Sequence, residues 1–172
     1  MRAENLRPHE KGRQFDMLSE LSISDGVVWS EVSTYLRRGG GTPDSEPARR
    51  LAAPSPTAIW RVPGDIGRRY AYVSGDRNPI HLHPLTAKLF GFPAAIAHGM
   101  WTKARTLAAF EGRLPGAYTV DVRFTLPVLL PAKVAFTSWE TGQGWAFELW
   151  NARKPKPHLA GTIRSAATPD LR

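Results

Sequence analysis

The sequence lacks several features that define large classes of proteins. It contains no cysteine, which excludes disulfides, a thiolate nucleophile and cysteine-ligated metals. No apolar run approaches the roughly 18 residues that a transmembrane helix requires. The N-terminal stretch 1–14 is polar and charged, without the apolar segment of a signal peptide. We therefore expect a cytoplasmic protein without a membrane partner.

Concentrated charge is also missing, although the chain is basic. Lys and Arg number 23 against 15 Asp and Glu, a net charge of +8, but no five basic residues follow one another. No nucleic-acid-binding motif accompanies the basic residues, so we expect no nucleic-acid partner. A solvated surface is the simplest interpretation, and a phosphorylated ligand or an acidic acyl carrier protein is the principal alternative.

The residues that are present suit a globular domain with an appendage. The 172 residues include six Trp and seven Phe, and 42% are hydrophobic, which is enough to build a core. We expect a disordered tail up to residue 12 and a β-hairpin over 13–37 that turns at Asp25-Gly26. Three consecutive Gly and four Pro mark 38–56 as a linker. The main domain is expected over 57–168.

The main domain combines short helices, one longer helix and a run of strands. A strand is expected over 58–62 and short helices over 63–72 and 84–90. The longer helix over 99–111 carries an apolar stripe at helical spacing, formed by Met100, Trp101, Ala104, Leu107 and Ala108. Alternating strands follow from residue 117 onward. This order indicates an α+β fold, with an antiparallel sheet wrapped around the long helix.

The most informative segment is YVSGDRNPIHLHP, residues 72–84. Asp76 and His81 lie five residues apart, a spacing that would separate them on a helix. We interpret the segment as a loop, in which Gly75 frees the backbone and Asn78 braces the turn. Such a loop can direct a carboxylate and an imidazole into one pocket, where they hold a water molecule and share proton transfer.

A second segment, AIAHGMW at 95–101, supplies a different chemical element. Gly99 stands where the long helix begins, so its N–H has no partner within the helix. The positive end of the helix dipole and the missing side chain allow a carbonyl oxygen to dock there and to be held as it gains charge. A base, an acid and an oxyanion donor together are what the addition of water to an α,β-unsaturated thioester requires.

The stretch YAYVSGDRNPIHLHP resembles the hydratase motif of MaoC-like (R)-specific enoyl-CoA hydratases, also known as 3-hydroxyacyl-thioester dehydratases. The spacing to AIAHGM and to VDVRFTLPVLLPAKV is similar to that family as well, so the resemblance covers residues 57–168. It implies a hot-dog fold and a hydro-lyase. It also implies that Asp76 and His81 activate water while the Gly99 N–H holds the thioester oxygen. Asn78 and His98 are expected to line the substrate site.

The resemblance further implies reversible hydration of trans-2-enoyl thioesters and dehydration of (R)-3-hydroxyacyl thioesters in fatty-acid metabolism. CoA or the phosphopantetheine of an acyl carrier protein carries the substrate, and no other cofactor is expected. Members of the family form dimers of hot-dog units or fuse two units in one chain. We therefore predict a homodimer or a partner hot-dog subunit, and we interpret the hairpin over 13–37 as a remnant of a first unit. An acidic residue often follows two positions after the histidine of the motif, where this chain has His83.

Other interpretations of the same residues remain open at this point. Asp76 could serve only as a turn residue, and His81 only as a histidine of the loop, without any catalytic function. A metal site formed by His81, His83 and His98 is disfavoured because a loop places no clear third ligand, so no metal is expected. A hot-dog thioesterase and a non-catalytic acyl-thioester-binding subunit are the alternative functions. Arg77 and Arg123 are candidates for contact with the phosphates of the carrier.

Overall fold

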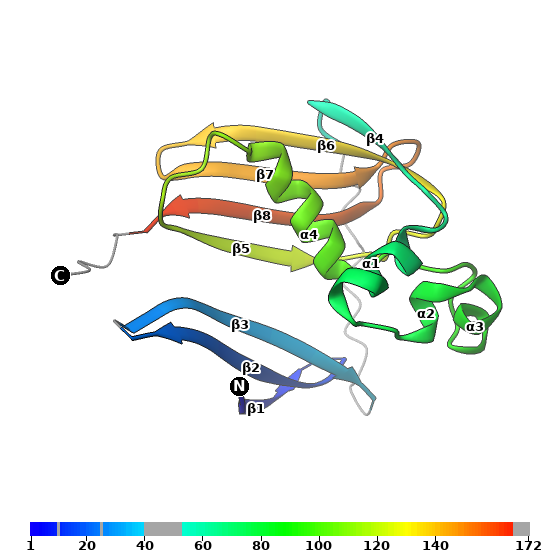
Figure 1. Ribbon diagram of the computed structural model, residues 1–172. Coiled ribbons are helices and arrows are strands. Elements are labelled where there is room, and N and C mark those ends of the chain that lie inside the picture. The colour runs from blue at the N-terminus through cyan, green and yellow to red at the C-terminus, as the bar shows by residue number, and fades with distance from the viewer. Residues whose placement is uncertain (10, 25, 40–52, 167–172) are drawn as a thin grey trace. The chain divides into compact units, whose positions relative to one another are not determined.

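A computed structural model describes residues 1–9, 11–24, 26–39 and 53–166, which form two compact units. The smaller unit comprises the N-terminal strands, and the larger unit comprises the elements from residue 53 onward. Figure 1 shows the elements of both. Among the helices of these residues, none combines the length and hydropathy needed to cross a bilayer.

The smaller unit is a three-stranded antiparallel sheet of β1 (Arg2–His9), β2 (Gly12–Ile23) and β3 (Gly26–Arg38), in that order. The expected pairing across the hairpin is confirmed, with Leu18 opposite Val32, although Asp25 of the turn lies outside the described residues. The expectation of a disordered tail is wrong, because residues 2–9 pair with β2. Most of the expected linker, residues 40–52, lies outside the described residues.

A buried carboxylate explains why the N-terminal residues are ordered. Asp16 on β2 is only 6% exposed and accepts hydrogen bonds from Arg7, Asn5 and Thr34. Arg7 binds it with both terminal nitrogens, at 2.8 and 3.1 Å, in the two-pronged geometry that strengthens such pairs. These hydrogen bonds, that from Arg7 first, hold the pKa of Asp16 well below its usual range. The ion pair therefore fastens β1 to β2.

The larger unit is built on a five-stranded antiparallel sheet in the order β4-β6-β7-β8-β5. Its strands are β4 (Ala58–Val62), β5 (Tyr118–Phe124), β6 (Ala132–Thr141), β7 (Gly144–Asn151) and β8 (Pro157–Ser165). The long helix α4 (Gly99–Leu107) continues as a short 3-10 helix, η1 (Ala108–Phe110), and lies across one face of this sheet (Figure 1). The expected α+β hot-dog fold is confirmed.

The core lies between α4 and the sheet, but the helix does not present the side that its sequence suggested. Thr102, Thr106 and Phe110 are the buried residues of α4 and η1. Both threonine hydroxyls donate to carbonyls of the helix itself, so their burial leaves no donor unpaired. Of the expected apolar stripe, Trp101 and Leu107 pack against the core. Met100, Ala104 and Ala108 are exposed on the unit, which makes that part of the prediction wrong.

Three short helices connect β4 to α4: α1 (Ile66–Ser74), α2 (Pro79–Leu82) and α3 (Pro84–Leu89). The expected helices over 63–72 and 84–90 therefore exist with shifted ends. The prediction of a loop over 72–84 is wrong in part, because His81 lies within the helix α2. Pro79 begins that helical turn, where a missing N–H costs nothing.

Candidate active site

The segment between α1 and α2 is shaped by its own side chains. Helix α1 ends at Gly75, whose φ of 75° is the left-handed conformation that glycine adopts without strain. Oδ1 of Asp76 then accepts the backbone N–H of Asn78 at 3.1 Å, and Oδ1 of Asn78 accepts that of Ile80 at 3.4 Å. Asn78 is thus the N-cap of α2. Asp76 braces the turn through Oδ1, while its side chain stays 53% exposed.

His81 is held by a carbonyl group from a distant segment. Its Nδ1 lies 2.8 Å from the backbone oxygen of Ile96, and Ile96 N–H donates back to the oxygen of Ile80 at 3.1 Å. Because a carbonyl oxygen only accepts, the Nδ1 atom must carry the proton, and Nε2 must carry the free lone pair. Burial lowers the pKa of His81, which favours the neutral imidazole. The ring is therefore oriented and protonated as a base acting through Nε2.

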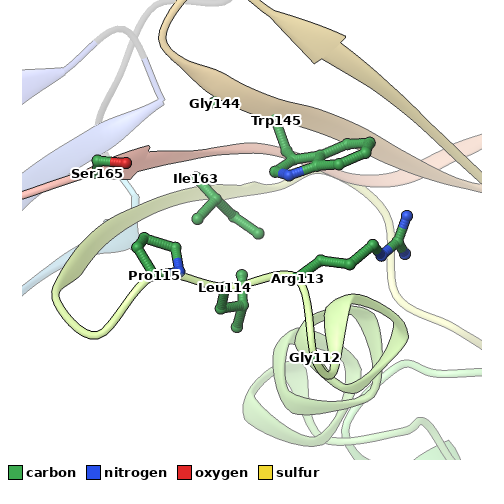
Figure 2. A pocket seen from close by; sticks show the side chains of 8 residues that line it. All are labelled: Gly112, Arg113, Leu114, Pro115, Gly144, Trp145, Ile163 and Ser165. Atoms are coloured by element: carbon green, nitrogen blue, oxygen red, sulfur yellow. The ribbon is translucent and has the colours of Figure 1, made fainter.

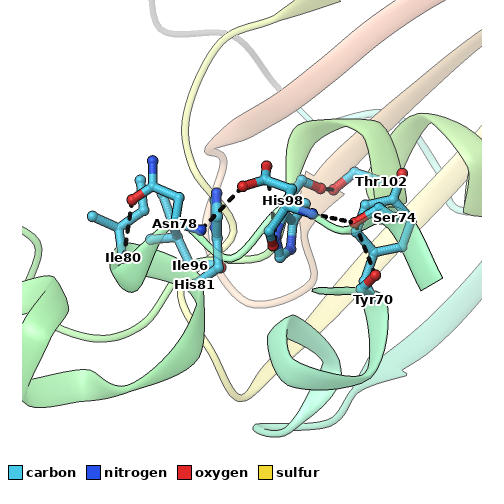
Figure 3. A network of polar contacts seen from close by, with 9 residues as sticks. Tyr70, Ser74, Asn78, Ile80, His81, Ile96, His98 and Thr102 are labelled. Atoms are coloured by element: carbon cyan, nitrogen blue, oxygen red, sulfur yellow. Dashed lines mark hydrogen bonds and ion pairs between the residues drawn. The ribbon is translucent and has the colours of Figure 1, made fainter. Parts of the chain in front are cut away.

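His98 contacts both members of the proposed pair. Its ring stacks on that of His81, with centroids 3.7 Å apart and planes inclined by 26°. Figure 3 shows the side chains of this group of residues. Its Nε2 lies 3.0 Å from the backbone oxygen of Asp76, to which it donates, and 3.7 Å from Oδ2 of the same residue. The side chain is only 3% exposed, and its other face meets the ring of Tyr70 at 4.9 Å. The structure thus brings Asp76, His81 and His98 together.

These three residues also form a conceivable metal-ligand set, since their ligand atoms lie within 4.8 Å of one another. The ring geometry argues against a shared ion. Imidazole lone pairs lie in the ring plane, and two nearly parallel stacked rings direct them side by side and not toward one point. Nδ1 of His81 and Nε2 of His98 are moreover occupied with carbonyl oxygens. The arrangement suits proton transfer better than metal binding.

His83, the third histidine of the metal interpretation, has a different function. Its Nδ1 accepts the N–H of Leu85 at 3.2 Å, so His83 is the N-cap of α3. The departure from the family pattern at this position therefore preserves helix capping by another side chain. Arg77 and Arg123 are exposed, and a contact with carrier phosphates stays a prediction for both.

Gly99 is the first residue of α4 and follows His98 directly, so its N–H is one of the amides at the start of this helix. Gly99 is exposed, and a Cβ atom placed there would lie 3.3 Å from the ring of Phe124. The missing side chain therefore keeps the space between the helix start and Phe124 open. A ligand oxygen can reach an N–H at this position.

Gly67, a buried residue of α1, was not among the candidates that the sequence indicated. A Cβ atom at this position would lie 1.9 Å from the backbone oxygen of His81, so only glycine permits α1 and α2 to approach so closely. A glycine inside a short helix was the available signal, because it costs up to about 1 kcal/mol relative to alanine without a packing reason. Gly67 therefore allows the close backbone contact between α1 and α2 that determines the position of His81.

A small cavity of about 340 Å³ lies elsewhere in the larger unit. Figure 2 shows it between the segment after η1 and the strands β7 and β8, with Arg113 and Trp145 on its wall. The guanidinium of Arg113 lies 4.8 Å from the centroid of the Trp145 ring, so these two lining residues form a cation–π contact with each other. Neither Asp76 nor His81 lines this cavity, which we treat as a packing gap.

The long helix α4 against a five-stranded antiparallel sheet defines this unit as a hot-dog domain, with Asp76, His81 and His98 clustered before the start of that helix. The family model described as MaoC like domain matches residues 40–161. The chain therefore belongs to the MaoC-like domain family.

Known proteins similar to this chain agree with that assignment. It is 44% identical over 168 residues to 3-hydroxyacyl-thioester dehydratase X of Mycobacterium tuberculosis, covering 95% of this chain and 60% of that protein. It is 32% identical over 135 residues to dehydratase Y of the same organism, covering 72% of this chain and 47% of that protein. A crystal structure of the first relative, HtdX, superposes with a TM-score of 0.82 at 43% identity, covering 96% of this chain and 65% of that one. The chain thus spans about half to two thirds of the length of these relatives.

Proposed function

We propose that this chain hydrates trans-2-enoyl thioesters and, in reverse, dehydrates (R)-3-hydroxyacyl thioesters of fatty-acid metabolism. The observation that carries the proposal is the grouping of Asp76 and His81 with His98, whose side-chain ligand atoms lie within 4.8 Å of one another, directly before Gly99 at the start of α4. The names of the two relatives, both 3-hydroxyacyl-thioester dehydratases, support the substrate class. The chemistry is proton transfer, which side chains can perform. We therefore propose that the reaction needs no cofactor and that CoA or phosphopantetheine takes part only as the carrier of the thioester substrate.

In the hydration direction, Oδ2 of Asp76 and Nε2 of His81 hold one water molecule between them. The basic member of the pair removes a proton from the water as its oxygen bonds to the β-carbon of the substrate. The electron pair of the double bond moves toward the thioester oxygen, where the Gly99 N–H stabilises the enolate-like charge. The pair then returns a proton to the α-carbon, which gives the 3-hydroxyacyl thioester and restores the starting protonation state of the pair. Dehydration follows the same steps backwards.

His98 supports this pair without needing to touch the substrate. Its ring is almost fully buried, which favours a positioning role over the direct substrate contact expected from the sequence. By stacking on His81 and donating to the backbone of Asp76, it fixes the separation of the two groups. Asn78 acts through the start of α2, and so through the orientation of His81.

The test replaces each member of the pair by a residue of similar shape that cannot exchange a proton at neutral pH. Asp76→Asn and His81→Asn should each lower turnover of trans-2-enoyl-CoA by about 10²–10⁴-fold while the melting temperature is kept. The double variant should be little worse than either single variant, because both groups act on one water. Loss of the enoyl-thioester absorbance, with short and long chains and with CoA and carrier-protein substrates, also assigns the carrier and the chain length.

Matched controls come from residues outside the pair. His83→Asn is the same substitution two residues away and retains a good N-cap for α3, and Asp121→Asn removes an exposed carboxylate on β5. Both should retain turnover. Near-normal turnover in a stable Asp76→Asn protein would exclude the proposed mechanism, and it would leave the two residues as braces of the turn.

Two alternative functions give different products in the same assay. A hot-dog thioesterase releases a free thiol, which a thiol reagent detects, whereas hydration leaves the thioester intact. A non-catalytic subunit binds the enoyl thioester and leaves its absorbance unchanged. We also propose that β1–β3 belong to a first hot-dog unit, since the similarity to dehydratase X covers 95% of the chain and so extends into this sheet.

A further inference from the structure

A second and larger cavity, of about 910 Å³, lies at one end of the five-stranded sheet. Its walls come from the end of β4, the start of β6, the β7–β8 turn and the segments 92–93 and 126–131. The lining includes neither Asp76, His81 nor Gly99, so this cavity is separate from the proposed active site. Its volume lies within the range of about 300–1,000 Å³ typical of small-molecule sites.

The floor of the cavity is apolar. The aliphatic and aromatic lining residues are Val62, Phe92, Leu126, Leu129 and Ala132, together with four prolines. Leu126 and Leu129 are 42% and 39% exposed, so hydrophobic surface is available to a ligand. Burial of such surface on binding is favourable, because it removes apolar area from water. The floor therefore suits an aliphatic chain.

The rim has the opposite character. Five cations, Arg61, Lys133, Arg153, Lys154 and Lys156, line the cavity, and no Asp or Glu is among the lining residues. Within the described part of the chain, none of these five side chains takes part in an ion pair or a side-chain hydrogen bond. Arg7 and Arg164, by contrast, each pair with an aspartate. Like charges gathered around a concave apolar surface raise the local potential and favour an anion.

A histidine in the wall adds an unsatisfied polar atom. His158 is 6% exposed, and its Nδ1 donates to the oxygen of Leu126 at 3.0 Å. This bond leaves the lone pair on Nε2, which has no hydrogen-bond partner among the described residues. A buried acceptor without a donor is costly, so a water molecule that donates a hydrogen bond to Nε2 is stabilised at this wall, whereas a carboxylate offers it no donor.

We propose that this cavity binds a long-chain fatty carboxylate, with the aliphatic chain on the apolar floor and the carboxylate among the five cations. The inference goes beyond the proposed function and does not rest on it, because it concerns binding in a cavity whose lining includes neither Asp76 nor His81. The cationic rim disfavours a neutral or cationic amphiphile. The apolar floor disfavours a small inorganic anion.

Direct calorimetry with dodecanoate on the full chain tests the proposal. Binding should be at least about 10-fold tighter than that of dodecanol, dodecyltrimethylammonium or inorganic phosphate, which lack the head group or the chain. The triple variant Lys133→Glu, Arg153→Glu, Lys156→Glu should weaken dodecanoate binding by at least about 10-fold. Leu126→Trp, which fills part of the floor without a change of charge, should do the same if the triple variant fails to fold.

The matched control changes the same charge elsewhere. Arg13→Glu, Arg37→Glu, Lys88→Glu replaces three exposed cations outside the cavity and should bind dodecanoate normally. Equal loss in both triple variants would show unspecific attraction and overturn the proposal, as would phosphate binding as tightly as dodecanoate.

Turnover and inhibition measurements distinguish binding in this cavity from binding at the proposed active site. Turnover of an uncharged N-acetylcysteamine enoyl thioester should persist in the cavity variants. Competitive inhibition by dodecanoate that survives the cavity substitutions would place the ligand at the active site and overturn the proposal. Loss of turnover in the Asp76 and His81 variants tests only the proposed function, so the two failures are distinguishable.

Discussion

At the level of single residues, the two carboxylate oxygens of Asp76 make different contacts. Oδ1 accepts the N–H of Asn78 and holds the turn, while Oδ2 lies on the side of His98. His81 is similarly divided, because Nδ1 is committed to Ile96 and Nε2 is free. In the proposed mechanism, each residue therefore uses one atom for structure and the other for proton transfer, so the same residues can form a turn motif and a catalytic motif.

The state of His81 predicts a pH dependence. The neutral ring is the form that accepts a proton, so activity is present above the pKa of His81 and is lost as the pH falls through it. Because burial lowers this pKa, the acid limb of kcat/KM due to His81 should lie below about pH 6.5, the ordinary value for histidine. NMR titration of the five histidines, assigned with His81→Asn, checks which group gives the limb. A His81 titration above pH 7 would contradict the structure.

His98 gives a second prediction at this scale. His98→Phe keeps a ring against His81 but removes the donor to Asp76, and it removes an electrostatic influence of His98 that adds to burial in lowering the pKa of His81. We expect kcat to fall by about 10-fold with little change in KM, since positioning errors act on the transition state. The acid limb should also move to higher pH. A purely structural role would lower the melting temperature and leave the limb in place.

At the level of elements, the close contact of α1 and α2 decides where His81 stands. Gly67→Ala adds a methyl group that would lie 1.9 Å from the carbonyl oxygen of His81, so α2 must move. Overpacking of this kind costs about 1–3 kcal/mol, and a displacement of about 1 Å at a catalytic group can cost 10²-fold in rate. We therefore expect both lower stability and about 10²-fold lower turnover.

The control for Gly67 is Gly116→Ala, because a methyl group at that glycine meets no atom within 4 Å. Chemical denaturation and turnover are measured on both variants. If Gly67→Ala were as stable and as active as the control, then α2 would have to be free to shift without loss, and the proposed support of His81 would be wrong.

At the level of the whole molecule, the larger unit leaves apolar surface on α4 and on the edge strand β5. Met100 is 45% exposed, and Tyr118 and Phe124 are 41% and 48% exposed. Edge strands and apolar patches of this kind are commonly covered by association. We expect self-association as a twofold dimer, measured by sedimentation at micromolar concentration.

A charge placed on the exposed side of α4 tests this association. Ala104→Glu should shift the equilibrium toward the monomer, whereas Gln143→Glu in the β6–β7 turn should not. A wild-type protein that sediments as a monomer at micromolar concentration would count against the dimer. The partner hot-dog unit of the sequence-based prediction would then be the remaining candidate for covering this face.

The sequence by itself determined the motif, the α+β class and the alternation of the strands, because these depend on residues near one another in the chain. Local patterns also placed helix starts at Pro84 and Gly99. The burial of Thr102 and Thr106 in place of the apolar stripe could not be predicted, since the side a helix presents depends on how it docks. The same holds for the helical turn that carries His81.

Only the tertiary structure decided which distant residues meet. The stacking of His98 on His81, the approach of Gly67 to the backbone of His81 and the gathering of five cations around one cavity all join segments far apart in the chain. Such contacts depend on strand register and on helix docking, which are properties of the packed molecule. Periodicity and turn chemistry describe a chain one segment at a time, and they contain no information about which segments become neighbours.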